Sequence, residues 1–354
     1  MNGAAKFALT PLSVIYGLGV RVRNVLYRRH ILHTRQVDAP VISVGNLTVG
    51  GTGKTPLVEW IANQLARNGL RVTVLTRGYG RESSGRVVVS DGNVIHTDVD
   101  KAGDEPFLLA QNLIGRAAVI CDEDRFASAA WAIEHLESDL FVLDDAFQHQ
   151  RIKRDLNILT IDANSPWGDG KLLPQGKLRE PISELSRADC VVITRAVDSG
   201  RVDELRNEIE SRCPGLPTFV SRTEFLGLRN LNRTNSPSEV NPIRLQPIAA
   251  FCGIGSPESF FSLLRGAGFQ LRDTREFRDH YKYKQADIDR VVNHATQSGA
   301  EALLTTAKDA VKLKSLSFAL PCYIVDIAIE IEDQEKFLEC ISRAVAVRGP
   351  QKSS

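Results

Sequence analysis

Six cysteines occur in the 354 residues, and no two of them form a C-x-x-C pair. This spacing excludes the usual zinc-binding and redox motifs and favours reduced, unpaired thiols. The net charge is only +1, which argues against a protein that coats nucleic acid. Internal repeats and long low-complexity tracts are also missing. With 43% hydrophobic and 25% charged residues, the composition is that of a globular protein with a packed core.

Acidic residues are missing from the start of the chain, where the first is Asp38. Residues 7–20 are mostly apolar, and arginines follow at positions 21, 23, 28, 29 and 35. The apolar stretch is shorter than the roughly 20 residues of a membrane-spanning helix, and it lacks the cleavage pattern of a signal peptide. We expect residues 1–37 to form an interfacial helix with a basic flank that meets an anionic bilayer surface. The alternative is a helix that packs on the core and carries a basic face.

Short apolar runs alternate with amphipathic stretches over residues 38–224. The apolar runs are continuous, which is typical of parallel strands that are covered on both faces. They lie at 40–44, 72–76, 117–121, 140–143, 156–161 and 190–194, and helical patterns lie at 55–68, 125–135 and 202–211. The pattern predicts a doubly wound, mostly parallel α/β fold.

A second, smaller α/β unit is predicted over residues 247–348. Strand patterns at 247–252, 302–306 and 322–329 alternate there with helical patterns at 257–267, 285–297 and 334–347. The polar segment 225–246 is predicted to be a connector or an irregular hairpin. Residues 349–354 are expected to form a frayed tail.

A glycine-rich segment joins the first predicted strand to the first predicted helix. It ends in Gly53, Lys54 and Thr55, as in the G-x-x-x-x-G-K-[ST] pattern of P-loop proteins, although Thr48 replaces the first glycine of that pattern. Backbone N–H groups of such a loop surround phosphate oxygens, and the following helix adds a favourable dipole. We expect Lys54 to reach the phosphates of ATP and Thr55 to bind Mg²⁺. The expected nucleotide-binding residues are Thr48, Val49, Gly50, Gly51, Thr52, Gly53, Lys54 and Thr55.

Several titratable residues occupy sequence positions that suit phosphoryl transfer. Asp144 and Asp145 end an apolar strand, as in a Walker B motif, and are expected to have different roles because adjacent side chains on a strand diverge. Asp104 precedes a helical pattern and suits either a helix cap or the activation of an acceptor hydroxyl. His280 is the histidine best placed for proton transfer. Arg179, in the glycine- and proline-rich loop 170–181, suits the stabilisation of phosphoryl charge.

Taken together as a series along the chain, these motifs resemble the tetraacyldisaccharide 4'-kinase family of lipid A biosynthesis. The matching blocks are 45–56, 76–80, 103–106, 144–149, 172–181, 279–280 and 306–312. The resemblance implies transfer of the γ-phosphate of ATP to the 4'-hydroxyl of a membrane-embedded, acylated glucosamine disaccharide 1-phosphate, which gives lipid IVA. It also implies a peripheral enzyme on the cytoplasmic face of the bacterial inner membrane. No obligate protein partner is indicated.

The resemblance further implies roles for single residues. Asp104 and His280 would act as a catalytic pair on the acceptor hydroxyl, and Lys54 and Arg179 would lie beside the phosphates. The substrate-binding positions would be Asn46, Arg77, Tyr79, Arg125, Gln148 and His149. The metal-binding positions would be Thr55, Asp144, Asp145 and Glu105.

Other classes of P-loop protein compete with a lipid kinase. A membrane-associated ATPase or GTPase regulator would share the phosphate loop, but a GTPase carries an N-K-x-D motif that this sequence lacks. A ligase that phosphorylates a small soluble acid would leave the apolar and basic N-terminal segment unexplained.

Overall fold

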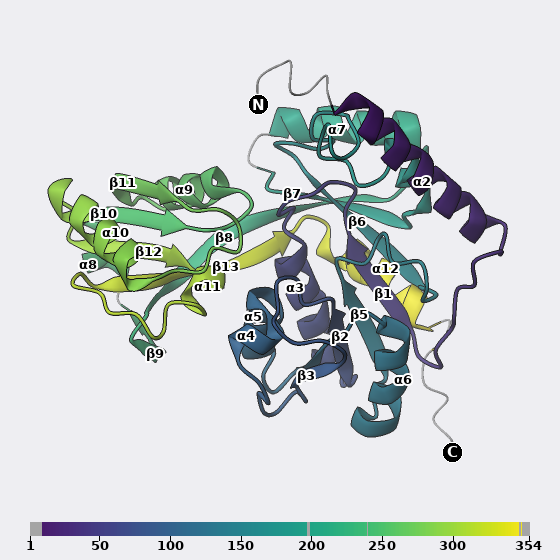
Figure 1. The fold of residues 1–354 in the computed structure, drawn as a ribbon, viewed down its shortest axis with the longest axis horizontal. Coiled ribbons are helices and arrows are strands. Elements are labelled where there is room, and N and C mark those ends of the chain that lie inside the picture. Colours follow the sequence, from purple (N-terminus) through teal and green to yellow (C-terminus); the bar gives the residue numbers. More distant parts are fainter. Residues whose placement is uncertain (1–8, 197–198, 239, 347, 349–354) are drawn as a thin grey trace.

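The computed structural model describes residues 9–196, 199–238, 240–346 and 348. The described chain forms a larger and a smaller α/β unit that share one continuous sheet of 13 strands (Figure 1). Residues 1–8 of the expected interfacial segment and the expected tail, 349–354, lie outside the described residues.

Buried parallel strands form the centre of the larger unit. They are β1 (Val41–Gly45), β2 (Val72–Thr76), β4 (Ala117–Cys121), β5 (Leu140–Asp144), β6 (Leu156–Asp162) and β7 (Cys190–Thr194), and the antiparallel edge strand β3 (Val87–Ser90) pairs with β4. Every residue of the parallel strands is buried, which explains their continuous apolar sequence. Because β1 lies between β5 and β6, its C-terminal end opens where the strand order reverses, the usual ligand position in such sheets.

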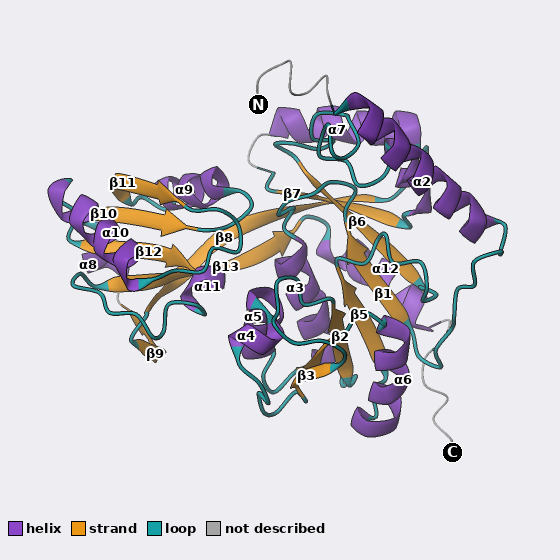
Figure 2. Ribbon diagram, in the orientation of Figure 1, coloured by secondary structure: helices purple, strands orange, loops and turns teal. Residues whose placement is uncertain are grey.

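Helices cover both faces of this sheet (Figure 2). One face carries α3 (Lys54–Arg67), α5 (Asp104–Asn112) and α12 (Gln334–Ala346), and the other carries α6 (Arg125–Leu136) and α7 (Ser199–Arg212). Two short elements, α4 (Val99–Ala102) and the 3-10 helix η1 (Ile182–Arg187), lie in the connections. The doubly wound, mostly parallel α/β fold predicted from the sequence is confirmed.

The smaller unit repeats the layered arrangement. Parallel strands β10 (Pro247–Cys252), β11 (Gln270–Glu276) and β12 (Ala302–Thr306) continue into the start of β13 (Cys322–Ile331). One face is covered by α8 (Val240–Arg244) and α9 (Pro257–Gly266), and the other by α10 (Gln285–Gln297) and α11 (Ala307–Ala310).

A two-stranded antiparallel ribbon joins the units. It consists of β13 and β8 (Thr218–Asn230), which pair from Ser221 with Ile331 to Asn230 with Tyr323. Exposed and half-buried residues alternate over residues 222–227 of β8, so this strand lacks the continuous apolar run by which the other central strands were predicted. The segment predicted as a connector, 225–246, therefore holds the end of β8, the strand β9 (Arg233–Ser238) that pairs with it, and α8.

The end of the described chain returns to the larger unit. The sequence placed residues 247–348 in the smaller unit, but α12 packs on the core formed by β1, β2 and α3. The ring of Phe337 is buried with its centroid 4.9 Å from that of Phe219 and 5.8 Å from that of Trp60. Hydrophobic periodicity predicted this helix but carries no information about which sheet it covers.

The N-terminal helix α2 (Thr10–Arg28) has two different faces. Its inner face, marked by Ser13, Gly17, Val20 and Asn24, packs on the larger unit, where the Ser13 hydroxyl donates to Leu172 O at 2.9 Å. Its outer face exposes large apolar side chains: Leu12, Val14, Ile15, Leu18, Val22 and Val25. Among the described residues, no helix has the length and apolar content needed to cross a membrane.

Candidate active site

A cavity of about 2410 Å³ lies between the two units, at the C-terminal ends of β1, β2 and β5. The larger unit contributes the P-loop, the start of α5 and the loop after β5, and the smaller unit contributes the β10–α9 loop and the start of α11. The cavity brings together most of the residues singled out from the sequence, namely Val49, Gly50, Gly51, Thr52, Gly53, Lys54, Thr55, Arg77, Tyr79, Glu105, Arg125, Asp144, Asp145, Gln148, His149, Arg179 and His280.

Three of the predicted residues are buried and do not belong to the cavity lining: Asn46, Thr48 and Asp104. Asn46 is fully buried, and its side-chain amide has no hydrogen-bond partner. Thr48 forms an isolated β-bridge with Leu178. Asp104 is connected to the cavity through His280. Substrate binding by Asn46 and nucleotide binding by Thr48 remain predictions.

The P-loop runs from the end of β1 to Lys54, the first residue of α3. Gly50 and Gly53 have φ angles of 111° and 74°, which side chains other than glycine rarely adopt. The loop needs its glycines at these two turns, whereas the extended pairing of Thr48 tolerates a side chain. The mismatch with the P-loop pattern at Thr48 is therefore compatible with the observed loop.

Asp145 links the P-loop lysine to the loop that precedes η1. Its carboxylate lies 3.4 Å from Lys54 Nζ, and Nη1 of Arg179 donates to both carboxylate oxygens at 2.8 Å. Burial raises the pKa of Asp145, but the charges of Lys54 and Arg179 outweigh burial and lower the pKa below its ordinary value. Asp145 has a φ of 48°, an unfavourable backbone conformation of the kind that concentrates at functional sites.

Asp144 is a buried carboxylate with few hydrogen-bond partners. Its Oδ1 has no hydrogen-bond partner, and Oδ2 accepts only a long, 3.4 Å bond from the Thr76 hydroxyl. Burial, together with the nearby charges of Glu105 and Asp145, raises the pKa of Asp144 to about 7. A hard divalent cation would satisfy this oxygen and relieve the repulsion, so the donor set fits Mg²⁺. In the part of the chain that the structure describes, no three His, Cys, Asp or Glu side chains already converge as a metal cluster.

Asp104 and His280 meet across the boundary between the units. His280 Nδ1 lies 2.9 Å from both carboxylate oxygens of Asp104. Burial raises the pKa of Asp104, but the hydrogen bond from His280 and the positive charges around it lower the pKa to about 2. The same hydrogen bond raises the pKa of His280. Gly103, rather than Asp104, is the N-cap of α5, and Asp104 Oδ1 also accepts a hydrogen bond from Glu105 N at 2.9 Å.

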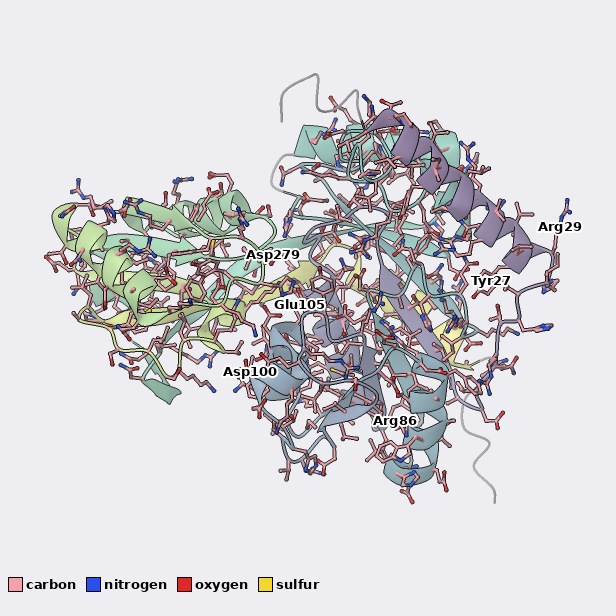
Figure 3. All side chains as sticks on the ribbon, viewed as in Figure 1. Tyr27, Arg29, Arg86, Asp100, Glu105 and Asp279 are labelled. Carbon is pink, nitrogen blue, oxygen red and sulfur yellow. The ribbon has the colours of Figure 1, made fainter. Side chains whose placement is uncertain are left out.

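Two lysines of the smaller unit complete the charge network, and the sequence reasoning assigned them no role. Lys308 Nζ lies 2.7 Å from Glu105 and 3.0 Å from Asp279, two acidic residues that Figure 3 places at the boundary between the units. Lys312 Nζ lies 3.4 Å from Asp104. Burial lowers the pKa of Lys308, but the surrounding carboxylates outweigh burial and raise it.

The remaining predicted residues also line the cavity. The ring of Tyr79, which is 71% exposed, has its centroid 5.4 Å from that of His280. Arg77 is exposed, and its Nη2 lies 3.7 Å from Glu123 Oε1. Arg125 is buried, and the Gln148 amide donates to Asn46 O at 2.9 Å. Burial and the nearby arginines lower the pKa of His149 to about 4, so its ring is neutral.

Known proteins match this chain over nearly its whole length. A model of the family described as tetraacyldisaccharide-1-P 4'-kinase matches residues 5–346. The tetraacyldisaccharide 4'-kinases of Halothermothrix orenii and Pelobacter propionicus are 35% and 43% identical, over 95% and 87% of this chain and 92% and 83% of their own lengths. The structure of LpxK from Aquifex aeolicus in complex with ATP has a TM-score of 0.76 and 32% identity, and the match covers 96% of this chain and 99% of that one. The chain belongs to the tetraacyldisaccharide-1-P 4'-kinase family.

Proposed function

We propose that this protein transfers the γ-phosphate of ATP to the 4'-hydroxyl of tetraacyldisaccharide 1-phosphate and thereby forms lipid IVA. The observation that carries the proposal is the Asp104–His280 pair, in which His280 lines the P-loop cavity and its Nδ1 lies 2.9 Å from the Asp104 carboxylate. A P-loop alone indicates only that a nucleotide binds. A proton acceptor facing the same cavity adds what a kinase requires for a hydroxyl acceptor.

The nucleotide end of the reaction is assigned to the P-loop. Its backbone N–H groups and the start of α3 bind the phosphates, and Lys54 neutralises the β- and γ-phosphates. Thr55, Asp144 and Asp145, with Glu105, are the residues that would hold Mg²⁺. The ion would supply charge neutralisation on the phosphate oxygens. Arg179, held beside Lys54 through Asp145, is positioned to stabilise charge on the transferred phosphoryl group.

The acceptor end is assigned to His280 and Asp104. His280 takes the proton of the 4'-hydroxyl, and Asp104 orients the ring and stabilises the charge that the ring gains. Tyr79 lies beside His280, and Gln148, His149 and Arg125 also line the cavity. These side chains are assigned to the sugar and phosphate groups of the acceptor, because they offer hydrogen-bond donors and acceptors around the transfer point.

We further propose that the protein binds the cytoplasmic face of the inner membrane as a peripheral enzyme through α2. A substrate with four acyl chains stays in the bilayer, so its kinase has to reach the bilayer surface. The exposed stripe on α2 includes Ile15 and Leu18, which are 67% and 62% exposed. The arginines nearby suit an anionic surface, although Arg23 and Arg28 are also paired with Glu180 and Glu184.

Labelled ATP tests the transfer directly. With γ-labelled ATP and detergent-dispersed tetraacyldisaccharide 1-phosphate, we expect label in the lipid, and Lys54→Ala should abolish it because the γ-phosphate loses its main counter-charge. Hydrolysis of ATP without labelled lipid would contradict the proposal. That result would favour the alternative, a membrane-associated P-loop ATPase or regulator.

The titration of His280 tests the pair. Asp104 is the main cause that raises the pKa of His280, whereas burial and Lys308 lower it. Asp104→Asn should therefore shift the pKa of His280 downwards, and NMR titration of the ring carbon-bound protons measures the shift. Asp91→Asn is the matched control, because Asp91 pairs with His96 away from the cavity and its loss should leave His280 unchanged. An unaltered titration in Asp104→Asn would rule out the pair in solution.

Binding to anionic lipid vesicles tests the role of α2. Replacing Ile15 and Leu18 together by serine removes apolar surface from the stripe and should weaken vesicle binding about tenfold or more. Leu245→Ser serves as the control, since Leu245 is 82% exposed but lies on the smaller unit. Equal partition of the double variant and the wild type in a sedimentation assay would exclude this face as the membrane contact.

A further inference from the structure

Lys308 reaches the catalytic pair from the smaller unit. It lies on the short helix α11, directly after β12, and only 14% of its side chain is exposed. Besides its contacts with Glu105 and Asp279, its Nζ lies 3.3 Å from His280 Nε2. Its ammonium group therefore touches one proposed metal ligand and one half of the proposed catalytic pair at the same time.

The contact with His280 fixes where the ring carries its proton. An ammonium group only donates hydrogen bonds, so Nε2 must accept one from Lys308. The proton of the neutral ring is then on Nδ1, which donates to Asp104 at 2.9 Å. Nε2 is the only ring nitrogen left to take a proton from an acceptor hydroxyl, and in this arrangement Lys308 occupies it. Lys308 has to move before His280 can act as a base.

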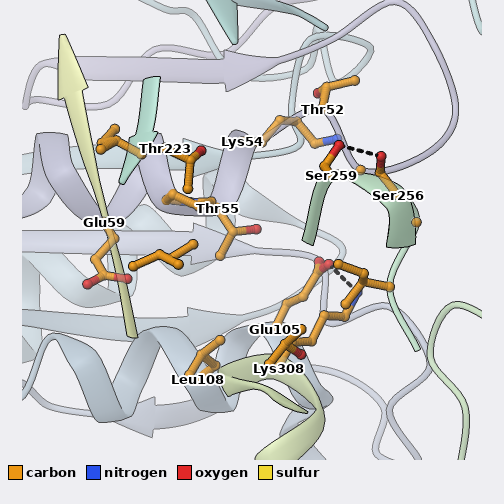
Figure 4. Close-up of a pocket in the computed structure, with 18 of the residues that line it drawn as sticks. Thr52, Lys54, Thr55, Glu59, Glu105, Leu108, Thr223, Ser256, Ser259 and Lys308 are labelled. Atoms are coloured by element: carbon orange, nitrogen blue, oxygen red, sulfur yellow. Dashed lines mark hydrogen bonds and ion pairs between the residues drawn. The ribbon is translucent and has the colours of Figure 1, made fainter. Parts of the chain in front are cut away.

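Lys308 lines the same cavity as the P-loop. Figure 4 shows its side chain beside Glu105 in the same cavity as Lys54 and Thr55 of the P-loop. A lysine has a compact charge on a flexible four-carbon chain and binds phosphate as a point charge. Lys312 differs, because it pairs with Asp104 and Asp309 and does not belong to the cavity lining.

We propose that Lys308 is a second phosphate-binding lysine of this kinase. When transfer begins, its ammonium group moves from His280 and Glu105 to the γ-phosphate of ATP. The proposal rests on the function proposed above. Once Nε2 is released, it accepts the proton of the 4'-hydroxyl, whose oxygen forms the new bond to phosphorus. The bond from phosphorus to the β–γ bridging oxygen breaks, and its electron pair leaves with ADP. Lys308 neutralises charge on the γ-phosphoryl oxygens during this exchange.

The affinity for ATP relative to ADP tests this contact in the absence of any lipid. Since the proposed contact is to the γ-phosphate, Lys308→Met should weaken ATP binding about tenfold or more in calorimetric titrations with Mg²⁺ and leave ADP binding unchanged. Lys308→Arg keeps the charge and should restore most of the preference for ATP. Lys314→Met makes the same change at an exposed lysine outside the cavity lining. The ratio of its ATP affinity to its ADP affinity should equal that of the wild type.

The transfer assay then measures the consequence for turnover. We expect kcat of Lys308→Met to fall about a hundredfold or more, as when a charge-stabilising donor is removed from an active site. An unchanged ratio of ATP to ADP affinity in Lys308→Met overturns the proposal. A loss of folded protein cannot change this ratio, because it lowers the number of binding sites for both nucleotides alike. If the ratio falls but the wild type labels no lipid, the γ-phosphate contact stands and the proposed acceptor is wrong.

Discussion

Buried carboxylates on the larger unit need positive partners, and the smaller unit supplies them. Asp104 is 6% exposed, and His280 and Lys312 of the smaller unit contact it. Lys308 pairs in the same way with Glu105, which is half-buried. Removing one partner of such a buried pair leaves an uncompensated charge, which is strongly unfavourable. The contact between the units is therefore made in part by groups that we assign to the chemistry, and residues of both units line the cavity.

A second set of contacts connects the outer surface to the phosphate loop. The Tyr16 hydroxyl of α2 donates to Arg179 O at 2.9 Å, and the Arg179 side chain holds Asp145, which lies beside Lys54. The buried Glu180 accepts hydrogen bonds from α2 in the same region. The helix proposed to meet the membrane thus packs directly on the loop that carries Arg179, so the proposed membrane contact and the proposed phosphate site lie on adjoining parts of the larger unit.

The sequence predicted what depends on local pattern and missed what depends on long-range placement. Buried parallel strands and the P-loop were predictable because continuous apolar runs and the Gly53–Thr55 ending are local signals. The strand β8 was missed because its exposure alternates, and α12 was found but assigned to the wrong neighbour. Asp104 and His280 are 176 residues apart, so only the family resemblance suggested that they pair. Lys308 lies in one of the matching blocks, yet nothing in its local sequence distinguishes it from a surface lysine.

The central claim is that Asp104 and His280 act as one unit across the boundary. A double-mutant cycle on kcat with Asp104→Asn, His280→Gln and both together tests this claim most directly. We expect each single variant to slow transfer about a hundredfold or more, and the double variant to be no slower than the slower single variant, because either change disables the same proton transfer. Effects that multiply in the double variant would show that the two residues act independently and would contradict the claim.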